Sequence, residues 1–366
     1  MAPVTTPYLF IDVLTVTLNF KAGKDAIDSH LSLWQLLQDT TAFPKAPTSM
    51  GYKRSVRVEL PSVKDKKHYP YLDYRFHKPT NTENGTPASP GMAERIRIRV
   101  HPRDLGPFGF VELDTIFKLF LHDGWGAFIK DGMVSKLEVS VDLPDIVLTS
   151  LHILPPKHRT CTVYRTGSTV RTIYLGKSKS DQIVLYDRGF KRLQKKQYSL
   201  AGPCTRLERK FHNANKLLKD LGSLPNPFDS LKFVDLPAKP PISKYQKKLS
   251  AEKKAAGEAI EGKADGTAYI WELFLDSVAQ RTLPVALKLL PESKQKDYRK
   301  HIEAHPCPWW NKDEVWKGWQ PYLDSLALVD AQFWIDGGYF TEDTSTDADA
   351  DESELEDGNL PYGHML

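Results

Sequence analysis

Apolar and polar side chains alternate along several short segments of the chain, and this alternation predicts β-strands. The alternation is strict over residues 94–100 (ERIRIRV) and 136–142 (KLEVSVD), and residues 8–20 (YLFIDVLTVTLNF) are rich in β-branched and aromatic side chains. Further strands are expected near residues 160–166, 170–175, 182–187 and 204–211. Strands that follow one another with few intervening helices favour a largely antiparallel sheet.

Helical segments, in which apolar residues recur every three or four positions, separate the groups of strands. Residues 25–39 and 111–122 have this spacing, and further helices are predicted near 212–221, 268–290 and 293–304. The combination predicts an α+β fold with a largely antiparallel sheet and helices packed on one face. The second half repeats the order of the first loosely, so two related half-sheets fit the pattern.

Composition divides the chain into four parts. Residues 1–235 hold the predicted sheet and are expected to form one domain. Residues 236–265 are rich in Pro and Lys and then in Ala, Glu and Lys, which is typical of a linker, and residues 266–340 are expected to form a small helical accessory region. Residues 341–366 form an acidic tail that is expected to be disordered.

The acidic tail lowers the net charge of the whole chain, and the rest of the chain is strongly basic. Nine of the 46 acidic residues and none of the 50 basic ones lie in residues 341–358, so the rest of the chain carries about +13. A basic body suggests a polyanionic partner. The tail either screens weak nonspecific contacts with that partner or only keeps the protein in solution.

Missing signals argue against several classes of protein. The three cysteines form no CxxC pair, which favours a reducing cytoplasm, and no run of eighteen apolar residues is present to span a membrane. The nucleotide-binding patterns GxGxxG and GxxxxGK[ST] and the hydrolase pattern GxSxG are absent. His301, His305 and Cys307 could hold zinc, but their spacing does not match HExxH. Histidine pairs separated by one apolar residue, which some nickases use to bind metal, are also absent.

Carboxylates recur on two of the predicted strands. Glu138 and Asp142 share one face of segment 136–142, where the alternation predicts carboxylates about 7 Å apart. Such a pair could hold Mg²⁺ or Mn²⁺, and Glu208 on segment 204–211 could complete the site from a neighbouring strand. The alternatives are an ordinary solvated strand face and an Arg–Glu cross-strand pair.

A basic segment follows a tyrosine. Residues 176–181 form a Lys/Ser turn, the next strand ends near Tyr186, and residues 188–216 contain nine Lys or Arg against one Glu. This density of cations is typical of phosphate-backbone binding, although a solvated basic helix has the same composition. The arginines of segment 94–100 either follow DNA phosphates or face water. The candidate DNA-binding residues are Lys177, Lys179, Arg188, Lys191, Arg192, Arg206, Arg95, Arg97 and Arg99.

Five segments are more informative about function together than each is alone. They are 10–20 (FIDVLTVTLNF), 95–106 (RIRIRVHPRDLG), 134–142 (VSKLEVSVD), 174–188 (YLGKSKSDQIVLYDR) and 205–211 (TRLERKF). In this order they resemble the opening strand, the Asn-Pro-x-x-Leu turn, the Arg-x-Asp-x-x-x-Asp strand, the Tyr-x-Gly-x-x-x-Ser-Asp…Tyr-Asp-Lys segment and the Arg-x-Glu strand of the replication initiation factor family. That family includes initiators of small staphylococcal rolling-circle plasmids and of some filamentous phages.

The resemblance covers residues 8–220 and has departures. His101 stands in place of the family's Asn, Lys136 in place of its Arg, and Glu138 in place of its first Asp. Val184 replaces an Arg that the family often has two residues before its tyrosine, and the preceding loop is one residue short. Tyr174 is therefore a rival nucleophile.

The resemblance implies a rolling-circle replication initiator. Tyr186 matches the family's nucleophile, and Glu138, Asp142 and Glu208 match its acidic positions for Mg²⁺ or Mn²⁺. The expected reaction is a nick in single-stranded origin DNA that forms a 5′-phosphotyrosine and frees a 3′-OH primer. Expected partners are single-stranded and duplex origin DNA, a host helicase and a host polymerase, and a homodimer is left open. A non-catalytic repressor on the same scaffold and a relaxase- or transposase-type tyrosine nickase are the alternatives.

Overall fold

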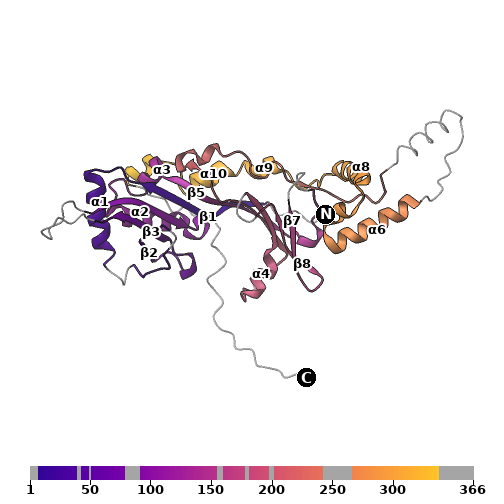
Figure 1. The fold of residues 1–366 in the computed structure, drawn as a ribbon, viewed down its shortest axis with the longest axis horizontal. Coiled ribbons are helices and arrows are strands. Elements are labelled where there is room, and N and C mark those ends of the chain that lie inside the picture. Colours follow the sequence, from indigo (N-terminus) through magenta and orange to yellow (C-terminus); the bar gives the residue numbers. More distant parts are fainter. Residues whose placement is uncertain are drawn as a thin grey trace, which may run out of the picture.

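One large sheet organises the molecule. The computed structural model describes residues 7–38, 43–48, 51–78, 91–154, 160–177, 181–197, 202–241 and 266–337. These residues form an elongated body around a ten-stranded antiparallel sheet (Figure 1), which confirms the predicted α+β class. Its strands are β1 (Tyr8–Asn19), β2 (Arg54–Arg57), β3 (Tyr71–His77), β4 (Met92–Val100), β5 (Met133–Pro144), β7 (Cys161–Thr166), β8 (Thr169–Leu175), β9 (Gln182–Asp187), β10 (Cys204–Phe211) and β11 (Lys216–Leu217). Two short strands, β6 (Ile153–Leu154) and β12 (Lys232–Phe233), pair separately.

The strand order is mirrored about the centre of the sheet. It runs β2-β3-β4-β1-β5-β10-β9-β8-β7, with β11 also paired to β5. The central strands β1 and β5 are antiparallel. The three strands that follow β1 along the chain, β2, β3 and β4, return to its side, and the four strands β7 to β10 that follow β5 return to the side of β5. This arrangement agrees with the two related half-sheets that the sequence suggested.

The described helices surround the sheet unevenly. They are α1 (Lys24–Leu36), α2 (Pro102–Lys118), α3 (Trp125–Asp131), α4 (Arg188–Gln194), α6 (Gly266–Arg281), α7 (Leu283–Leu289), α8 (Glu292–Glu303), α9 (Lys312–Trp316), α10 (Trp319–Ser325) and α11 (Ala331–Ile335), with 3₁₀ turns η1 (Lys66–His68), η2 (Leu148–Ser150) and η4 (Leu218–Ser223). Side chains of α1, α2, α3, α10 and α11 share one hydrophobic core with the apolar face of the sheet.

The two faces of the sheet differ in chemistry because strand residues alternate. Val139 and Val141 of β5 and Leu207 of β10 point into the hydrophobic core. Glu138 and Asp142 point to the opposite side, with the side chains that the register aligns with them on β1, β4, β9 and β10. We call this side the polar face. Helix α4 lies against it.

One predicted helix is wrong. Residues 212–221 form β11 and the 3₁₀ turn η4 instead. Asn215 has a left-handed backbone conformation (φ 48°), which interrupts an α-helix, and Lys216 and Leu217 find backbone partners on β5. The other strands and helices that the sequence predicted are present within a few residues of their expected ends, with two exceptions. The helix expected over 111–122 belongs to α2, which extends back to Pro102 but is kinked at Gly106, where the backbone is not helical (φ 59°). The single helix expected over 268–290 is two helices, α6 and α7.

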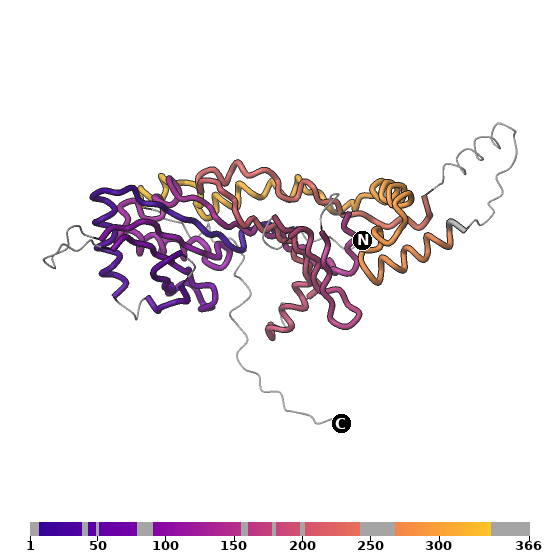
Figure 2. The backbone as a smooth tube through the Cα atoms, viewed as in Figure 1, coloured from indigo at the N-terminus to yellow at the C-terminus, as the bar shows by residue number. Residues whose placement is uncertain are grey.

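The C-terminal helices belong to two different cores. Trp271, Tyr298 and Ile302 form a small core among α6, α7 and α8, to which Leu154 and Val234 also contribute. The chain then runs back along the sheet (Figure 2), and α10 and α11 join the main core. The region 266–340, expected as one accessory unit, is thus divided. Residues 242–265 of the expected linker and the tail 341–366 lie outside the described residues.

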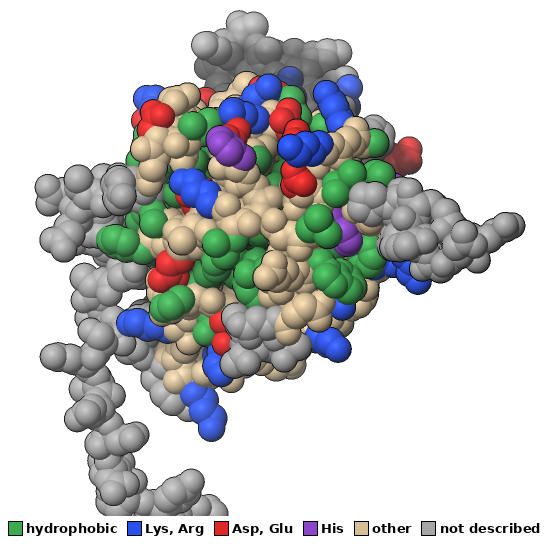
Figure 3. Space-filling view, turned by 90° about the vertical axis from the view of Figure 1, so that its left-hand side faces the viewer, with side chains coloured by type: hydrophobic (Ala, Val, Ile, Leu, Met, Phe, Trp, Pro, Cys, Tyr) green, Lys and Arg blue, Asp and Glu red, His purple; other side chains and the backbone are tan. Residues whose placement is uncertain are grey.

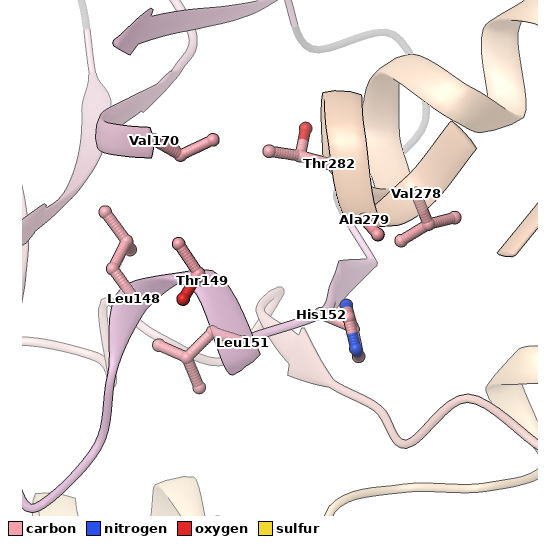
Figure 4. A pocket seen from close by; sticks show the side chains of 8 residues that line it. All are labelled: Leu148, Thr149, Leu151, His152, Val170, Val278, Ala279 and Thr282. Atoms are coloured by element: carbon pink, nitrogen blue, oxygen red, sulfur yellow. The ribbon is translucent and has the colours of Figure 1, made fainter. Parts of the chain in front are cut away.

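The small helical bundle meets the sheet at β8 and η2. Leu148, Leu151 and Val170 face Val278 and Thr282 across a small gap (Figure 4). The gap has a volume of about 10 Å³, which is about the space of one water molecule. It is therefore a packing junction rather than a ligand site.

Candidate active site on the polar face

Tyr186 lies on the polar face, near the end of β9 and two strands from β5. Its cross-strand neighbours are Thr172 on β8 and Arg206 on β10. The next residue, Asp187, accepts a hydrogen bond from the backbone N–H of Phe190 (2.8 Å) and so caps α4. This cap turns the chain back over the sheet, so that Lys191 Nζ lies 3.2 Å from the centroid of the Tyr186 ring. Tyr186 is only 5% exposed as a result.

A second feature beside Tyr186 is a buried ion pair. Arg206 donates to both carboxylate oxygens of Asp142, with Nε–Oδ1 and Nη2–Oδ2 distances of 2.5 and 2.8 Å. Arg103 and Arg188 each lie 3.5 Å from Asp142 Oδ2, and Asp12 Oδ1 lies 3.3 Å from Arg206 Nη1. Burial alone would raise the pKa of Asp142, but the hydrogen bonds and charge of Arg206 outweigh it and hold the pKa below its ordinary value.

A lysine bridges the two glutamates of the site. Lys210 Nζ lies 3.0 Å from Glu208 Oε2 and 3.4 Å from Glu138 Oε2, and Lys136 Nζ lies 2.6 Å from Glu138 Oε1. Burial would lower the pKa of Lys210, but the two carboxylates raise it above its ordinary value. Lys210 is therefore a protonated, fixed cation.

The hydroxyl of Tyr186 lies near the carboxylate of Glu208, whose charge acts on it. Burial raises the pKa of Tyr186 well above its ordinary value, and the negative charge of Glu208 raises it further. At neutral pH the site thus holds a protonated phenol with a carboxylate positioned to accept its proton.

The surroundings of Tyr186 carry an excess of positive charge. Six basic and four acidic side chains surround Tyr186, which leaves a net charge of two positive units. The basic ones are Arg103, Lys136, Arg188, Lys191, Arg206 and Lys210, and the acidic ones are Asp12, Glu138, Asp142 and Glu208. An anionic group such as a phosphate is attracted to such a site.

The three carboxylates expected to bind metal do not form a metal site in this arrangement. Glu138 and Asp142 are four residues apart, a rise of about 13 Å along a strand, so the predicted spacing of about 7 Å was wrong. Both oxygens of Asp142 are bound by Arg206, and Lys210 lies between Glu138 and Glu208. Among the described residues no three His, Cys, Asp or Glu side chains are close enough to hold a metal ion.

The predicted DNA-binding residues are distributed over the molecule. Arg188, Lys191 and Arg206 surround Tyr186, whereas Arg192 is half-buried on α4 and Lys177 is exposed after β8. Lys179 lies outside the described residues. The arginines of β4 lie on the polar face but on the other half-sheet: Arg95, Arg97 and Arg99.

Charge is not concentrated at the outer end of that half-sheet. Viewed along the long axis from the end that carries α1, the surface bears scattered basic and acidic side chains around a group of apolar ones (Figure 3). This end of the molecule therefore shows no patch of a single sign of charge among its described residues.

The rival nucleophile lies farther from the charged cluster. Tyr174 is aligned with Val184 and Thr162, and its ring contacts Tyr164 with centroids 5.4 Å apart. No ion pair joins it to the carboxylates and cations around Tyr186 within the described part of the chain.

Sequence reasoning missed four functional neighbours. Lys136 and Lys210 had a signal, because the strand alternation puts them on the same face as the glutamates. Asp12 and Arg103 had none, because they reach Asp142 and Arg206 only through the pairing of strands far apart in sequence and through the start of α2.

A scan against protein-family models finds no match for the chain, and no curated protein matches its sequence. The resemblance to replication initiation factors therefore rests on the five segments themselves. In the sheet these segments form β4, β1, β5, β10, β9 and the end of β8, which are consecutive neighbours. None of the helices in the described residues is long and apolar enough to cross a membrane.

Proposed function

We propose that this protein nicks single-stranded DNA at a rolling-circle origin, with Tyr186 as the nucleophile. One observation carries the proposal: Tyr186 lies near the carboxylate of Glu208 and opposite Arg206 in a surrounding of net positive charge. A nucleophile, an adjacent base and phosphate-binding cations are the parts that phosphodiester transfer to a side chain requires. The five motif segments add the substrate class by resemblance.

The chemistry follows from these neighbours. The Tyr186 oxygen attacks the phosphorus of the scissile phosphodiester while Glu208 accepts the phenolic proton. The bond from phosphorus to the 3′ oxygen breaks, and that oxygen leaves as a 3′-OH after it receives a proton from Glu208. The product is a 5′-phosphotyrosine, which retains one phosphodiester bond in place of another. The same site can therefore rejoin the strand without a nucleotide cofactor, in keeping with the absent nucleotide-binding patterns.

Cationic side chains stabilise the negative charge on the phosphoryl oxygens and on the leaving 3′ oxygen. Arg206 and Arg188 lie beside Tyr186, and Lys210 contacts the base itself. Fixed cations in a buried site are worth more than in water because they need no reorganisation during the reaction.

DNA has to displace Lys191 before it reaches Tyr186. The ammonium group now lies over the phenol ring, where it interacts with the π-electrons. A phosphate is a stronger partner for an ammonium group than an aromatic face. Lys191 therefore exchanges the ring for the scissile phosphate as the strand binds.

Mg²⁺ or Mn²⁺, expected from the resemblance, stays a prediction. Binding between Glu138 and Glu208 requires Lys210 to withdraw, and no step above depends on it. The proposed host polymerase, helicase, duplex origin and homodimer stay predictions as well.

The test is covalent transfer of DNA to the protein. Labelled single-stranded oligonucleotides that tile the protein's own replicon are incubated with the protein, with Mn²⁺ or with EDTA, and separated under denaturing conditions. We expect label on wild-type protein and on Tyr174→Phe, and none on Tyr186→Phe. Loss of label with Tyr174→Phe alone would keep the reaction but assign it to the other tyrosine.

A second candidate is a DNA-binding regulator on the same scaffold. The observation in its favour is that Tyr186 is covered and that a basic side chain neutralises each nearby carboxylate. Such a protein would bind the oligonucleotides tightly without cleaving them, and Tyr186→Phe would not change its affinity.

A further inference from the structure

A cluster on the first half-sheet has no role in the site around Tyr186. Tyr71 on β3 has Arg99 of β4 over its ring, with Cζ 4.3 Å from the ring centroid, and Arg57 of β2 at 5.6 Å. Arg57 Nη2 also donates to the Tyr71 hydroxyl at 3.4 Å. The three side chains come from three adjacent strands and are aligned in one row.

This row lies on the same face of the sheet as Tyr186. The register continues from Tyr71 and Arg99 to Thr15 on β1 and to Lys136 on β5, which contacts Glu138 of the candidate site. Five strand spacings separate β3 from β9, a distance of about 24 Å at about 4.8 Å per strand. The two positions are also offset along the strands, because the row of Tyr71 meets β5 at Lys136 and that of Tyr186 meets it at Asp142, about 20 Å further on. Together these separations give about 31 Å. A stacked single strand rises about 3.4 Å per nucleotide, so about nine nucleotides span the two positions.

The arginines of this row differ from their neighbours on the same strands. Arg97 is paired with Asp73 (2.8 Å) and Arg95 with Glu94 (2.8 Å), whereas Arg57 and Arg99 pair with no carboxylate among the described residues. Arg57 Nε is also buried without a hydrogen-bond partner in the described part of the chain. Arg99 is exposed. The row therefore has positive charge and hydrogen-bonding capacity that no partner among the described residues satisfies.

An arginine stacked on a tyrosine suits one kind of polyanion. Single-stranded nucleic acid offers a base to stack on the aromatic ring or guanidinium plane and phosphates to pair with the free cations. A duplex keeps its bases stacked inside and offers only phosphates to such a row.

We propose that Tyr71, Arg57 and Arg99 bind single-stranded DNA about nine nucleotides from the strand position held at Tyr186. The polar face would then hold one continuous strand across both half-sheets. The inference rests on the proposed function for the identity of the strand, but the binding itself needs no cleavage.

The experiment measures binding in a background that cannot cleave. Fluorescence anisotropy with single-stranded oligonucleotides of 6, 12 and 18 nucleotides is carried out on Tyr186→Phe and on the same protein with Tyr71→Ala, Tyr71→Phe or Arg99→Gln. Loss of base stacking predicts about tenfold weaker binding of the two longer strands by Tyr71→Ala, with little change for Tyr71→Phe. Arg99→Gln should weaken the same strands and lower their salt dependence.

The controls separate this site from the nicking site. Tyr269→Ala removes an exposed tyrosine of α6, outside the polar face, and should leave all affinities unchanged. Equal affinities for Tyr71→Ala and its parent at every length, or an equal loss for duplex DNA, would overturn the proposal. If wild-type protein forms no covalent adduct while the loss at Tyr71 persists, the nicking function falls and this site stands.

Discussion

At the scale of single residues, the proposed chemistry depends on how charges are paired around one phenol. Tyr186 is protonated because it is buried and adjacent to Glu208, and Glu208 is held in place by Lys210. The sequence predicted that Glu138, Asp142 and Glu208 share a strand face, since alternation fixes the face of each strand residue. It did not predict that each of these carboxylates forms an ion pair with a lysine or an arginine, because the strand register decides which side chains meet across the sheet.

The Asp142–Arg206 pair should contribute strongly to stability. Arg206→Met leaves a buried carboxylate without its bidentate partner and should cost about 3–5 kcal/mol in the free energy of unfolding. Because the folded pKa of Asp142 is depressed, this contribution is complete above its unfolded pKa of about 3.9 and is lost as pH falls through the lower folded value. Urea unfolding at pH 7 and at pH 3 should show the difference between the two proteins shrinking in acid.

The matched control is Arg97→Met, which breaks the ion pair with Asp73 on the other half-sheet. Arg97 is more exposed than Arg206, so its loss should cost less. Equal costs for the two substitutions would contradict the account of the Tyr186 surroundings.

Lys210 should compete with a metal ion. Lys210→Met removes a cation that lies within 3.4 Å of both Glu138 and Glu208, so repulsion of a divalent ion falls. We expect Mn²⁺ to bind at least tenfold more tightly to this variant, as measured by the electron paramagnetic resonance of free Mn²⁺. Lys195→Met, beyond the end of α4, is the control and should change nothing. The absence of Mn²⁺ binding in both proteins would remove the predicted cofactor.

At the scale of elements, α4 controls access to Tyr186. Its start is fixed by Asp187, which caps the helix and also pairs with Arg171 (2.5 Å), and the guanidinium of Arg171 stacks on Phe190 with Cζ 3.7 Å from the ring centroid. The basic composition after Tyr186 was compatible with a helix, but composition gave no reason for it to fold back over the sheet. The short helix α3 was not predicted, since its seven residues are too few for a clear apolar period.

Loosening the cap of α4 should uncover Tyr186. Asp187→Ala removes the cap and the pair with Arg171 and should destabilise the start of α4 by about 1 kcal/mol. Hydrogen exchange of the amides in residues 188–194 should become faster. Asp187→Asn keeps a capping side chain and should exchange more slowly than Asp187→Ala. Unchanged exchange in both variants would mean that packing, rather than the cap, holds α4.

At the scale of the whole molecule, the chain forms two half-sheets, and its C-terminal helices α10 and α11 then pack into the core of the sheet. Trp334 of α11 is buried in the main core, and its indole N–H donates to the carbonyl of Ala327 at 2.8 Å. The α+β class and most strands followed from local patterns. The path of the C-terminal segment did not, because its aromatic residues fit either a separate unit or the main core until tertiary contacts decide between them.

The acidic tail should weaken binding of single strands. Deletion of residues 341–366 removes nine negative charges and no positive ones, and the net charge rises from +4 to +13. Affinity for a noncognate single strand should rise several-fold at low salt and converge with that of the full chain at high salt, where charges are screened. A tail of the same length with Asn and Gln in place of the acids should behave like the deletion. Equal affinities at low salt would show that the tail does not compete with DNA.

The most direct measurement is the chemical identity of the residue that becomes attached to DNA. Wild-type protein is incubated with the oligonucleotide from its own replicon that accepts cleavage, digested with protease and nuclease, and analysed by mass spectrometry. The account predicts a nucleotide remnant on the peptide that contains Tyr186, linked through its phenolic oxygen. A remnant on any other residue, or none on a protein that binds the same strand tightly, would contradict it.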